Sequence, residues 1–304
     1  MKHNHPKIEI MDTTLRDGEQ TSGVSFVPHE KLMIARLLLE ELKVDRVEVA
    51  SARVSEGEFD AVRMICDWAA RRNMLPKVEV LGFVDGRTSV DWIHATGCRV
   101  INLLCKGSLK HCNCQLKKTP EEHIKDILAV VDYANEQDME VNIYLEDWSN
   151  GMKDSPEYVF LLMDALVQTN IKRYMLPDTL GILNPLQVIG FMRKMVKRYP
   201  QAHFDFHAHN DYDLAVSNVL AAVLSGCKGL HTTINGLGER AGNAPLASVQ
   251  AILKDHFNAI TNIDENRLND VSRVVESYSG IVIPANKPIV GENVFTQVAG
   301  VHAD

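Results

Sequence analysis

The stretch His203-Phe204-Asp205-Phe206-His207-Ala208-His209-Asn210-Asp211 carries the strongest structural signal in the chain. Because side chains alternate between the two faces of a strand, its two phenylalanines and its alanine share one face, which is apolar. His207 and His209 share the opposite face, where two adjacent imidazoles suit a divalent metal. A pair of hydrogen-bonded histidines inside a buried polar layer is the alternative interpretation.

Outward from this stretch, short apolar runs alternate eight times with amphipathic helical patterns. The expected strands are Ile8–Leu15, Arg46–Ser51, Lys77–Val84, Val100–Lys106, Glu140–Asp147, Arg173–Leu180, His203–Asn210 and Gly229–Gly236. This alternation predicts parallel strands, and eight units fit a closed TIM (β/α)8 barrel. An open doubly wound sheet would need a glycine-rich fingerprint after its first strand. The chain has Arg16-Asp17-Gly18-Glu19-Gln20 there, which favours the barrel.

We expect the barrel to occupy residues 1–280. Thr119, Ser155 and Asn184 each precede a proline, which predicts that they cap three of its helices. Residues 281–304 contain two prolines and no helical period, so they should leave the barrel as an extended linker arm.

Composition narrows the class of protein. The net charge of −8 includes no basic block, which argues against a nucleic-acid surface. No apolar run approaches the roughly 20 residues that cross a membrane, and the N-terminus lacks an apolar signal core. The six cysteines do not form a disulfide framework in a chain with this much core. These features predict a cytoplasmic enzyme.

In a TIM barrel the active site lies at the carboxyl ends of the strands. Polar residues gather there in strand after strand, and this convergence predicts the site. They are Arg16, Asp17, Glu146, Asp147, Asp178, Thr179, His207, His209, Asn235 and the loop 236–243.

Asp17 and the two histidines form a 2-His-1-carboxylate set that could bind Mg, Mn, Fe, Co or Zn. A 2-oxo acid could chelate such a metal, which would polarise the ketone as a Lewis acid. Arg16 could stabilise the developing alkoxide, or it could form a structural ion pair. The glycine-rich loop 236–243 could hold a phosphate or be a tight turn, and Asn243 could complete the metal shell.

Three segments resemble one family. Asp12–Gln20 (DTTLRDGEQ), His207–Asp211 (HAHND) and Gly236–Ala244 (GLGERAGNA) are similar to signatures of the 2-isopropylmalate, citramalate and homocitrate synthases. These are metal-dependent Claisen-condensing TIM barrels related to hydroxymethylglutaryl-CoA lyase. The resemblance implies condensation of acetyl-CoA with a 2-oxo acid, followed by thioester hydrolysis, with a divalent metal (Mg, Mn or Zn).

The resemblance also implies individual roles. Metal ligation falls to Asp17, His207 and His209, with Asn243 nearby; Arg16 and Thr179 serve the 2-oxo acid, and Glu146 is the general base. Segments such as Val49–Ser55 and Tyr144–Gly151 look closer to bacterial citramalate synthase. The resemblance implies that residues 281–304 are the start of a linker arm to a C-terminal regulatory domain, and the sequence stops at Asp304, just inside that linker.

The inward-facing residues Leu81, Leu104 and Tyr144 should leave room for little more than a methyl group on the oxo acid. This favours pyruvate, giving citramalate for isoleucine synthesis. 2-Isopropylmalate synthase, which uses 2-oxoisovalerate for leucine synthesis, is the main alternative, because the discrimination rests on one or two methyl groups. A lyase like hydroxymethylglutaryl-CoA lyase is a more distant one, and a non-catalytic metal-binding barrel is a rival from another class.

The arm carries several apolar residues that a lone barrel would leave partly in water, so it should find a partner. In the family such arms cross to a second subunit, and the histidine matching His302 approaches the neighbour's site. We therefore expect a homodimer in which His302 acts as an acid/base partner of Glu146. A frayed terminal histidine with no role is the alternative.

Overall fold

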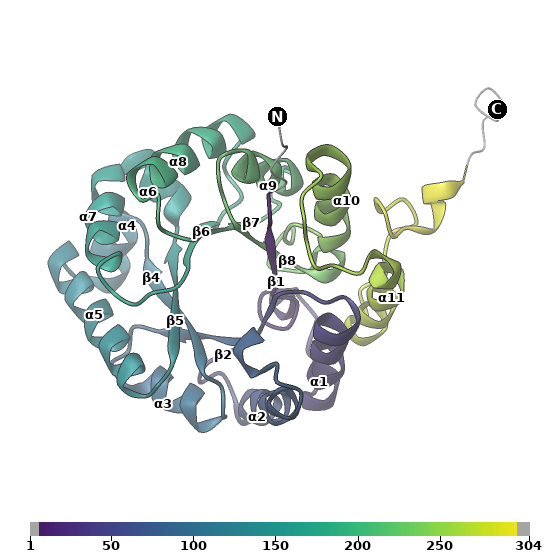
Figure 1. The fold of residues 1–304 in the computed structure, drawn as a ribbon, viewed down its shortest axis with the longest axis horizontal. Coiled ribbons are helices and arrows are strands. Elements are labelled where there is room, and N and C mark those ends of the chain that lie inside the picture. The colour runs from purple at the N-terminus through teal and green to yellow at the C-terminus, as the bar shows by residue number, and fades with distance from the viewer. Residues whose placement is uncertain (1–5, 297–304) are drawn as a thin grey trace.

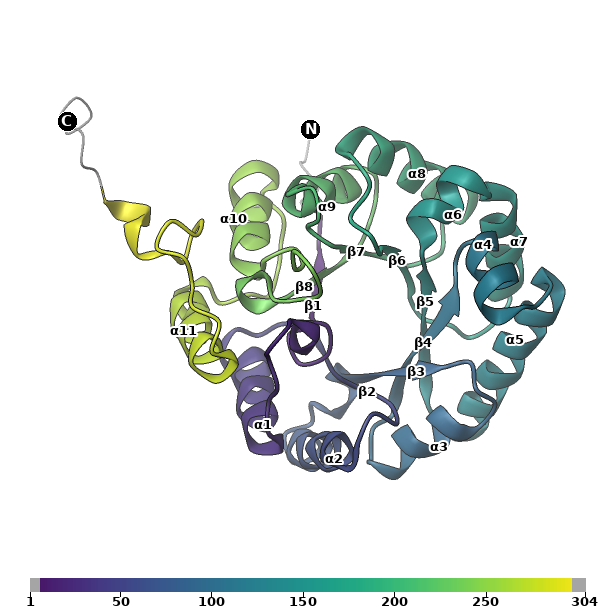
Figure 2. The same cartoon turned by 180° about the vertical axis from the view of Figure 1, so that it is seen from behind.

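The computed structural model describes residues 6–296, and its eight strands close into a parallel barrel (Figures 1 and 2). Each strand pairs with the next, and β8 pairs with β1. The strands are β1 (Glu9–Asp12), β2 (Arg46–Ser51), β3 (Val78–Phe83), β4 (Val100–Lys106), β5 (Glu140–Glu146), β6 (Tyr174–Asp178), β7 (Phe204–Ala208) and β8 (Gly229–Thr232). The expected TIM barrel is confirmed.

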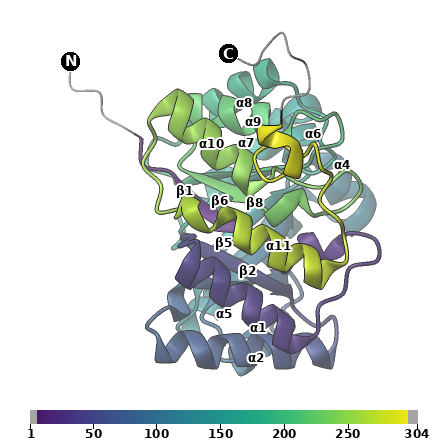
Figure 3. The same ribbon diagram turned by 90° about the vertical axis from the view of Figure 1, so that its right-hand side faces the viewer.

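Helices surround the barrel, and α1 lies beside α11 on its outer face (Figure 3). The helices are α1 (Pro28–Arg36), α2 (Glu56–Arg71), α3 (Thr88–Ala95), α4 (Leu109–His111), α5 (Pro120–Glu136), α6 (Trp148–Asp154), α7 (Pro156–Leu166), α8 (Pro185–Arg198), α9 (Ala215–Leu224), α10 (Leu246–Phe257) and α11 (Leu268–Ser279). Among the residues that the structure describes, no helix is long and apolar enough to span a membrane.

Several strands are shorter than expected. β1 ends at Asp12 because the chain then folds back, and the Thr13 carbonyl accepts hydrogen bonds from the N–H groups of Arg16, Asp17 and Gly18 at 2.9–3.2 Å. β8 ends at Thr232 and is followed by a short 3-10 turn. Tight turns at the carboxyl ends of the strands therefore replace the predicted strand extensions.

Two of the three expected helix caps are confirmed. The side chains of Thr119 and Asn184 accept hydrogen bonds from backbone N–H groups of the first turns of α5 and α8, at 3.2 and 3.0 Å. The prediction for Ser155 is wrong: its hydroxyl instead lies 3.4 Å from the Gly151 carbonyl and 3.3 Å from the Leu109 N–H. Ser155 joins α6 directly to α7, so its side chain serves the preceding helix.

The strands separate two different interiors. Apolar side chains fill the space between strands and helices, whereas the inside of the barrel holds buried charged and polar groups above and below one apolar layer. That layer consists of Met11, Leu81, Tyr144 and Met175, with Leu104 packed against it. Charges inside the barrel must be paired to be tolerated, and their pairing positions the site.

After α11 ends at Ser279, the chain leaves the barrel as a short arm (Figure 1). Ile283 and Val290 of the arm are buried against the body of the protein, whereas Val282 is 75% exposed. The division at residue 280 stays a prediction, and His302 lies outside the described residues.

Candidate metal centre and substrate cavity

Three predicted ligands converge at the carboxyl end of the barrel. His207 lies on β7, His209 follows that strand directly, and Asp17 lies in the turn after β1. One potential ligand atom from each lies within 4.8 Å of the other two. The Nε2 atoms of the histidines are 3.2 Å apart, and that of His207 is 3.2 Å from Asp17 Oδ2. The expectation that both imidazoles face the same way is confirmed.

The protonation states suit a cation. Burial lowers the pKa of both histidines, and that of His209 falls to about 4, so both rings are neutral at pH 7. Burial opposes ionisation of Asp17, but Arg16 and the imidazoles outweigh it and hold the pKa of this carboxyl well below its usual range. A carboxylate and two imidazole nitrogens that can each present a lone pair therefore lie close together, an arrangement that a divalent cation would stabilise.

Asn243 also belongs to this group. Its amide nitrogen donates hydrogen bonds to Asp17 Oδ1 and the Leu237 carbonyl, both at 3.0 Å. Its amide oxygen is buried and has no hydrogen-bond partner among the described residues. A buried acceptor beside the carboxylate fits either a further ligand or a water bound to a metal. The donor set therefore fits a divalent metal, without selecting which one.

Arg16 is fixed beside the predicted metal ligands. It donates from Nε to Glu48 at 2.6 Å, from Nη1 to Asp17 at 3.0 Å and from Nη2 to the Tyr144 hydroxyl at 3.3 Å. One N–H on each terminal nitrogen remains after these bonds. The structural ion pair and the catalytic role are therefore compatible, because the ion pairs orient the guanidinium and leave two donors.

A cavity of about 240 Å³ opens above the predicted metal ligands. All four predicted substrate-binding residues line it, together with Arg16, Glu146, Asp17 and both histidines. The substrate-binding residues are Leu81, Leu104, Tyr144 and Thr179. Leu81 and Tyr144 come from the apolar layer inside the barrel, so they form the floor and wall of the cavity.

Glu146, the predicted base, and Thr179 each contact a residue that is not one of the predicted metal ligands. Glu146, the last residue of β5, forms an ion pair with Lys106, which is its register partner on β4. The Thr179 hydroxyl accepts a hydrogen bond from the Asp147 N–H at 2.9 Å, and its own hydrogen stays available. Both side chains can therefore face a bound ligand.

Not every polar residue at this end serves the cavity. The Asp178 carboxylate accepts hydrogen bonds from the N–H groups of Ile182 and Leu183 at 3.1 and 3.0 Å, so it organises the loop after β6. The Asn235 amide donates to the Ser272 carbonyl at 2.9 Å and ties the loop after β8 to α11.

Sequence reasoning missed three residues that support the site: Glu48, Lys106 and His231. Glu48 is fully buried and holds Arg16, and His231 Nδ1 lies 3.1 Å from the Tyr144 hydroxyl. All three occupy inward positions of predicted strands, where a charged or polar residue is costly unless it is paired. That signal could have identified them, although not their partners.

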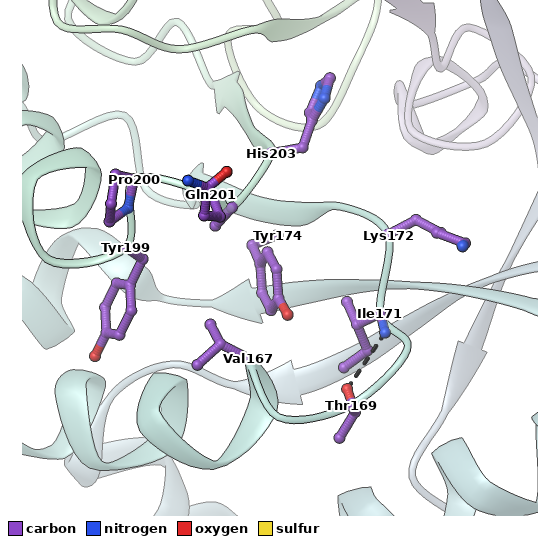
Figure 4. A pocket seen from close by; sticks show the side chains of 10 residues that line it. Val167, Thr169, Ile171, Lys172, Tyr174, Tyr199, Pro200, Gln201 and His203 are labelled. Atoms are coloured by element: carbon purple, nitrogen blue, oxygen red, sulfur yellow. Dashed lines mark hydrogen bonds between the residues drawn. The ribbon is translucent and has the colours of Figure 1, made fainter.

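A different cavity, of about 410 Å³, lies at the opposite end of the barrel, where β6 and β7 begin (Figure 4). Lys172 and His203 are the lining residues that could carry a positive charge, and no carboxylate lines it. The rest of its lining is apolar, aromatic or uncharged polar. Nothing there resembles the convergence of charged groups around Asp17.

Comparison with known proteins agrees with this geometry. A family model described as HMGL-like matches residues 7–275. A probable 2-isopropylmalate synthase from Ignicoccus hospitalis is 37% identical over 98% of this chain and 73% of its own length. An (R)-citramalate synthase from Methanocaldococcus jannaschii is 36% identical over 98% of this chain.

The chain spans only 58% of the length of that citramalate synthase. Among solved structures, the HMG-CoA lyase of Bacillus subtilis superposes with a TM-score of 0.78 at 20% identity, over 92% of this chain and 96% of its own. At that identity the likeness concerns the fold. The resemblance inferred from the three sequence motifs is confirmed by the family model and by the two synthases.

Proposed function

Because the chain belongs to the HMGL-like family, we propose that it is an acyltransferase that condenses acetyl-CoA with a short 2-oxo acid. The observation that carries this proposal is one cavity in which Asp17, both histidines, Arg16 and Glu146 meet. A non-catalytic metal site would not need a separate carboxylate and an oriented guanidinium facing the same space. The product is a 2-hydroxy diacid, released with free CoA.

The residues divide the chemistry between them. Asp17, His207 and His209 would hold a divalent metal, which supplies Lewis acidity toward the ketone of the oxo acid. Glu146 removes a proton from the acetyl methyl group, and the resulting carbanion equivalent attacks the ketone carbon. Arg16 directs its remaining N–H groups at the oxygen that becomes negative. Water then cleaves the thioester and releases the thiol.

We propose pyruvate as the preferred oxo acid. Tyr144 is 2% exposed, and its hydroxyl is held by Arg16, Glu48 and His231, so its ring is not free to move away from the cavity. With Leu81 and Leu104 it forms a wall that opposes a branched tail. 2-Oxoisovalerate is the second candidate, because a relative 37% identical is named a 2-isopropylmalate synthase.

Thiol release tests the reaction. Purified protein is incubated with acetyl-CoA, a divalent metal and either pyruvate, 2-oxobutyrate or 2-oxoisovalerate, and free CoA is followed with a thiol reagent. We expect release that depends on the oxo acid and stops when a chelator removes the metal. Cleavage of hydroxymethylglutaryl-CoA without release from acetyl-CoA would identify a lyase instead, and a higher kcat/KM for 2-oxoisovalerate would reverse the choice of oxo acid.

We also propose a homodimer in which His302 reaches the partner's cavity and exchanges a proton there with the help of Glu146. Exposed apolar side chains farther along the arm, such as Ile289 and Val294, support an intersubunit contact. Mixing inactive Glu146→Ala protein with inactive His302→Ala protein under subunit exchange should restore part of the activity. A fully active monomer would rule this arrangement out.

A further inference from the structure

A second cavity, of about 270 Å³, lies on the outer side of the glycine-rich loop that follows β8. Residues of this loop line one side of the cavity, and residues of the arm line the other. The arm follows α11 and is yellow in Figure 1. Its lining combines apolar side chains with a lysine from the arm. The main contributors are Leu237, Ile281, Val282, Ile283, Pro284 and Lys287.

Lys287 is a cation without a counter-ion in this cavity. Among residues 6–296 its ammonium group has neither an ion-pair partner nor a hydrogen-bond acceptor. Burial lowers its pKa, and the negative charge of Asp213 opposes that shift. Because a partly desolvated cation without an anion is unfavourable, an anionic ligand at this position would regain that free energy.

The backbone holds Lys287 in place from both sides. Its N–H donates to the Pro284 carbonyl at 2.8 Å, and its carbonyl accepts from the Gly291 N–H at 2.9 Å. Ile283 and Val290 anchor the flanking segments in the core. The ammonium group lies 3.4 Å from the position where a Cβ on Gly236 would stand, so the lysine faces the loop backbone closely.

The glycine-rich loop separates this cavity from the metal centre. A Cβ on Gly238 would meet the Asn243 amide at 2.2 Å, which shows how tightly one face of the loop packs against that centre. Glu239 lines the metal cavity, whereas its neighbours Gly238 and Arg240 line the second one. Likewise, Gln20 lines the metal cavity and its neighbour Thr21 lines the second one. A long ligand can therefore occupy both spaces by crossing one loop.

The loop backbone adds donors. The N–H groups of Glu239, Arg240 and Ala241 have no acceptor within the described part of the chain. Arg240 has a positive φ of 54°, and successive N–H groups in such a turn can surround an anion. The Arg240 guanidinium itself is already engaged by Asp211 at 2.8 Å, so Lys287 is the cation left for a ligand.

We propose that Lys287 and this cavity bind the phosphate groups of acetyl-CoA, while the apolar wall contacts the pantetheine arm. This inference rests on the proposed function, which places the acetyl thioester in the metal cavity. A lysine recognises phosphate as a compact point charge, and the adjoining Leu237, Ile281 and Val282 match an aliphatic chain.

The test compares Lys287→Ala with wild type on two substrates. Acetyl-CoA carries the phosphates, and S-acetylpantetheine has the same reacting end without them. We expect Lys287→Ala to raise KM for acetyl-CoA about tenfold, equivalent to about 1.4 kcal/mol, with kcat and KM for pyruvate unchanged. With S-acetylpantetheine the variant and wild type should be equal. Lys287→Arg should retain most of the affinity.

Lys125→Ala is the matched control, because it removes the same charge from an exposed position on α5. Unchanged acetyl-CoA kinetics in Lys287→Ala would overturn the inference, as would an equal loss with S-acetylpantetheine, which indicates a structural role. If wild type releases no thiol with any oxo acid, the proposed function fails. CoA binding measured by calorimetry then still decides the inference, which requires weaker binding by Lys287→Ala.

Discussion

The inside of the barrel holds two buried charged clusters, and they behave differently. In the lower cluster, near the amino ends of the strands, Arg46 lies between Glu79 and Asp205, and His231 contacts Asp205 at 3.1 Å. Each charge there faces an opposite charge. In the upper cluster, Asp17 is paired with Arg16 at 3.0 Å, but it also lies 3.2 Å from an imidazole nitrogen of His207 and borders a cavity. Burial of charge therefore does not mark the site; a buried charge beside two imidazoles and a cavity does.

The largest expected effect is a loss of activity when Asp17, in the upper cluster, is substituted. Asp17→Asn should lower kcat by at least about 100-fold, because it removes a metal ligand. Its metal-free stability should fall by less than that of Asp205→Asn, because Arg16 keeps Glu48 at 2.6 Å and borders a cavity from which water can hydrate it. Thiol release and urea unfolding in the presence of chelator measure the two quantities. A larger loss of stability than that of Asp205→Asn would mean that Asp17, like the charges of the lower cluster, mainly stabilises the fold.

The reciprocal prediction concerns Asp205. Asp205→Asn should destabilise the protein by about 3 kcal/mol, because Arg46 is 4% exposed and would keep only part of its compensation. Burial raises the pKa of Asp205, but Arg46 and two histidines outweigh it and hold that pKa well below its usual range, so the carboxylate is charged. The free energy of unfolding from urea titration checks this. Asp205→Asn protein that is as stable as wild type would erase the distinction between the clusters.

A smaller effect is expected at Tyr144, which connects the clusters. Its hydroxyl contacts Arg16 above and His231 below. Tyr144→Leu should raise kcat/KM for 2-oxoisovalerate relative to pyruvate by about 10- to 200-fold, the range for one methylene of pocket volume. Tyr144→Phe, which keeps the ring, should leave that ratio within about threefold. If Phe shifts the ratio as much as Leu does, the hydroxyl contacts and not the ring volume set the selectivity.

The sequence was sufficient to predict the strand–helix alternation and which side chains converge at the carboxyl end of the barrel. Strand alternation placed His207 and His209 on one face, and the turn after the first strand supplied Asp17, because these are local consequences of backbone geometry. The supports could not be assigned, since Glu48 on β2 meets Arg16, which follows β1, through a pairing of segments 32 residues apart in the sequence. Likewise, the arm's proximity to the glycine-rich loop, and hence the place of Lys287, depends on tertiary packing of residues far apart in sequence.

The smallest expected effect concerns His123, a titratable residue near the carboxyl end of β4. We assign it a role in stability and not in activity. It is 1% exposed, and its Nε2 accepts a hydrogen bond from the backbone N–H of Lys106, the partner of Glu146. Burial lowers its pKa to about 4, with Lys118 and Lys106 adding to the shift and Asp126 opposing it. The unfolded value is about 6.5. The unfolded chain therefore binds this proton more readily than the folded protein.

The contribution of His123 to the free energy of unfolding is thus fully present above pH 6.5 and declines as the pH falls toward 4. Between pH 7.5 and pH 5 the loss should be at most about 2 kcal/mol. His123→Gln is the matched variant, because its amide oxygen can accept the same hydrogen bond without titrating. Urea unfolding at the two pH values should show a smaller loss for the variant than for wild type. Equal losses would mean that the pKa of His123 is not lowered in the folded protein, and that burial of this histidine contributes no pH-dependent stability.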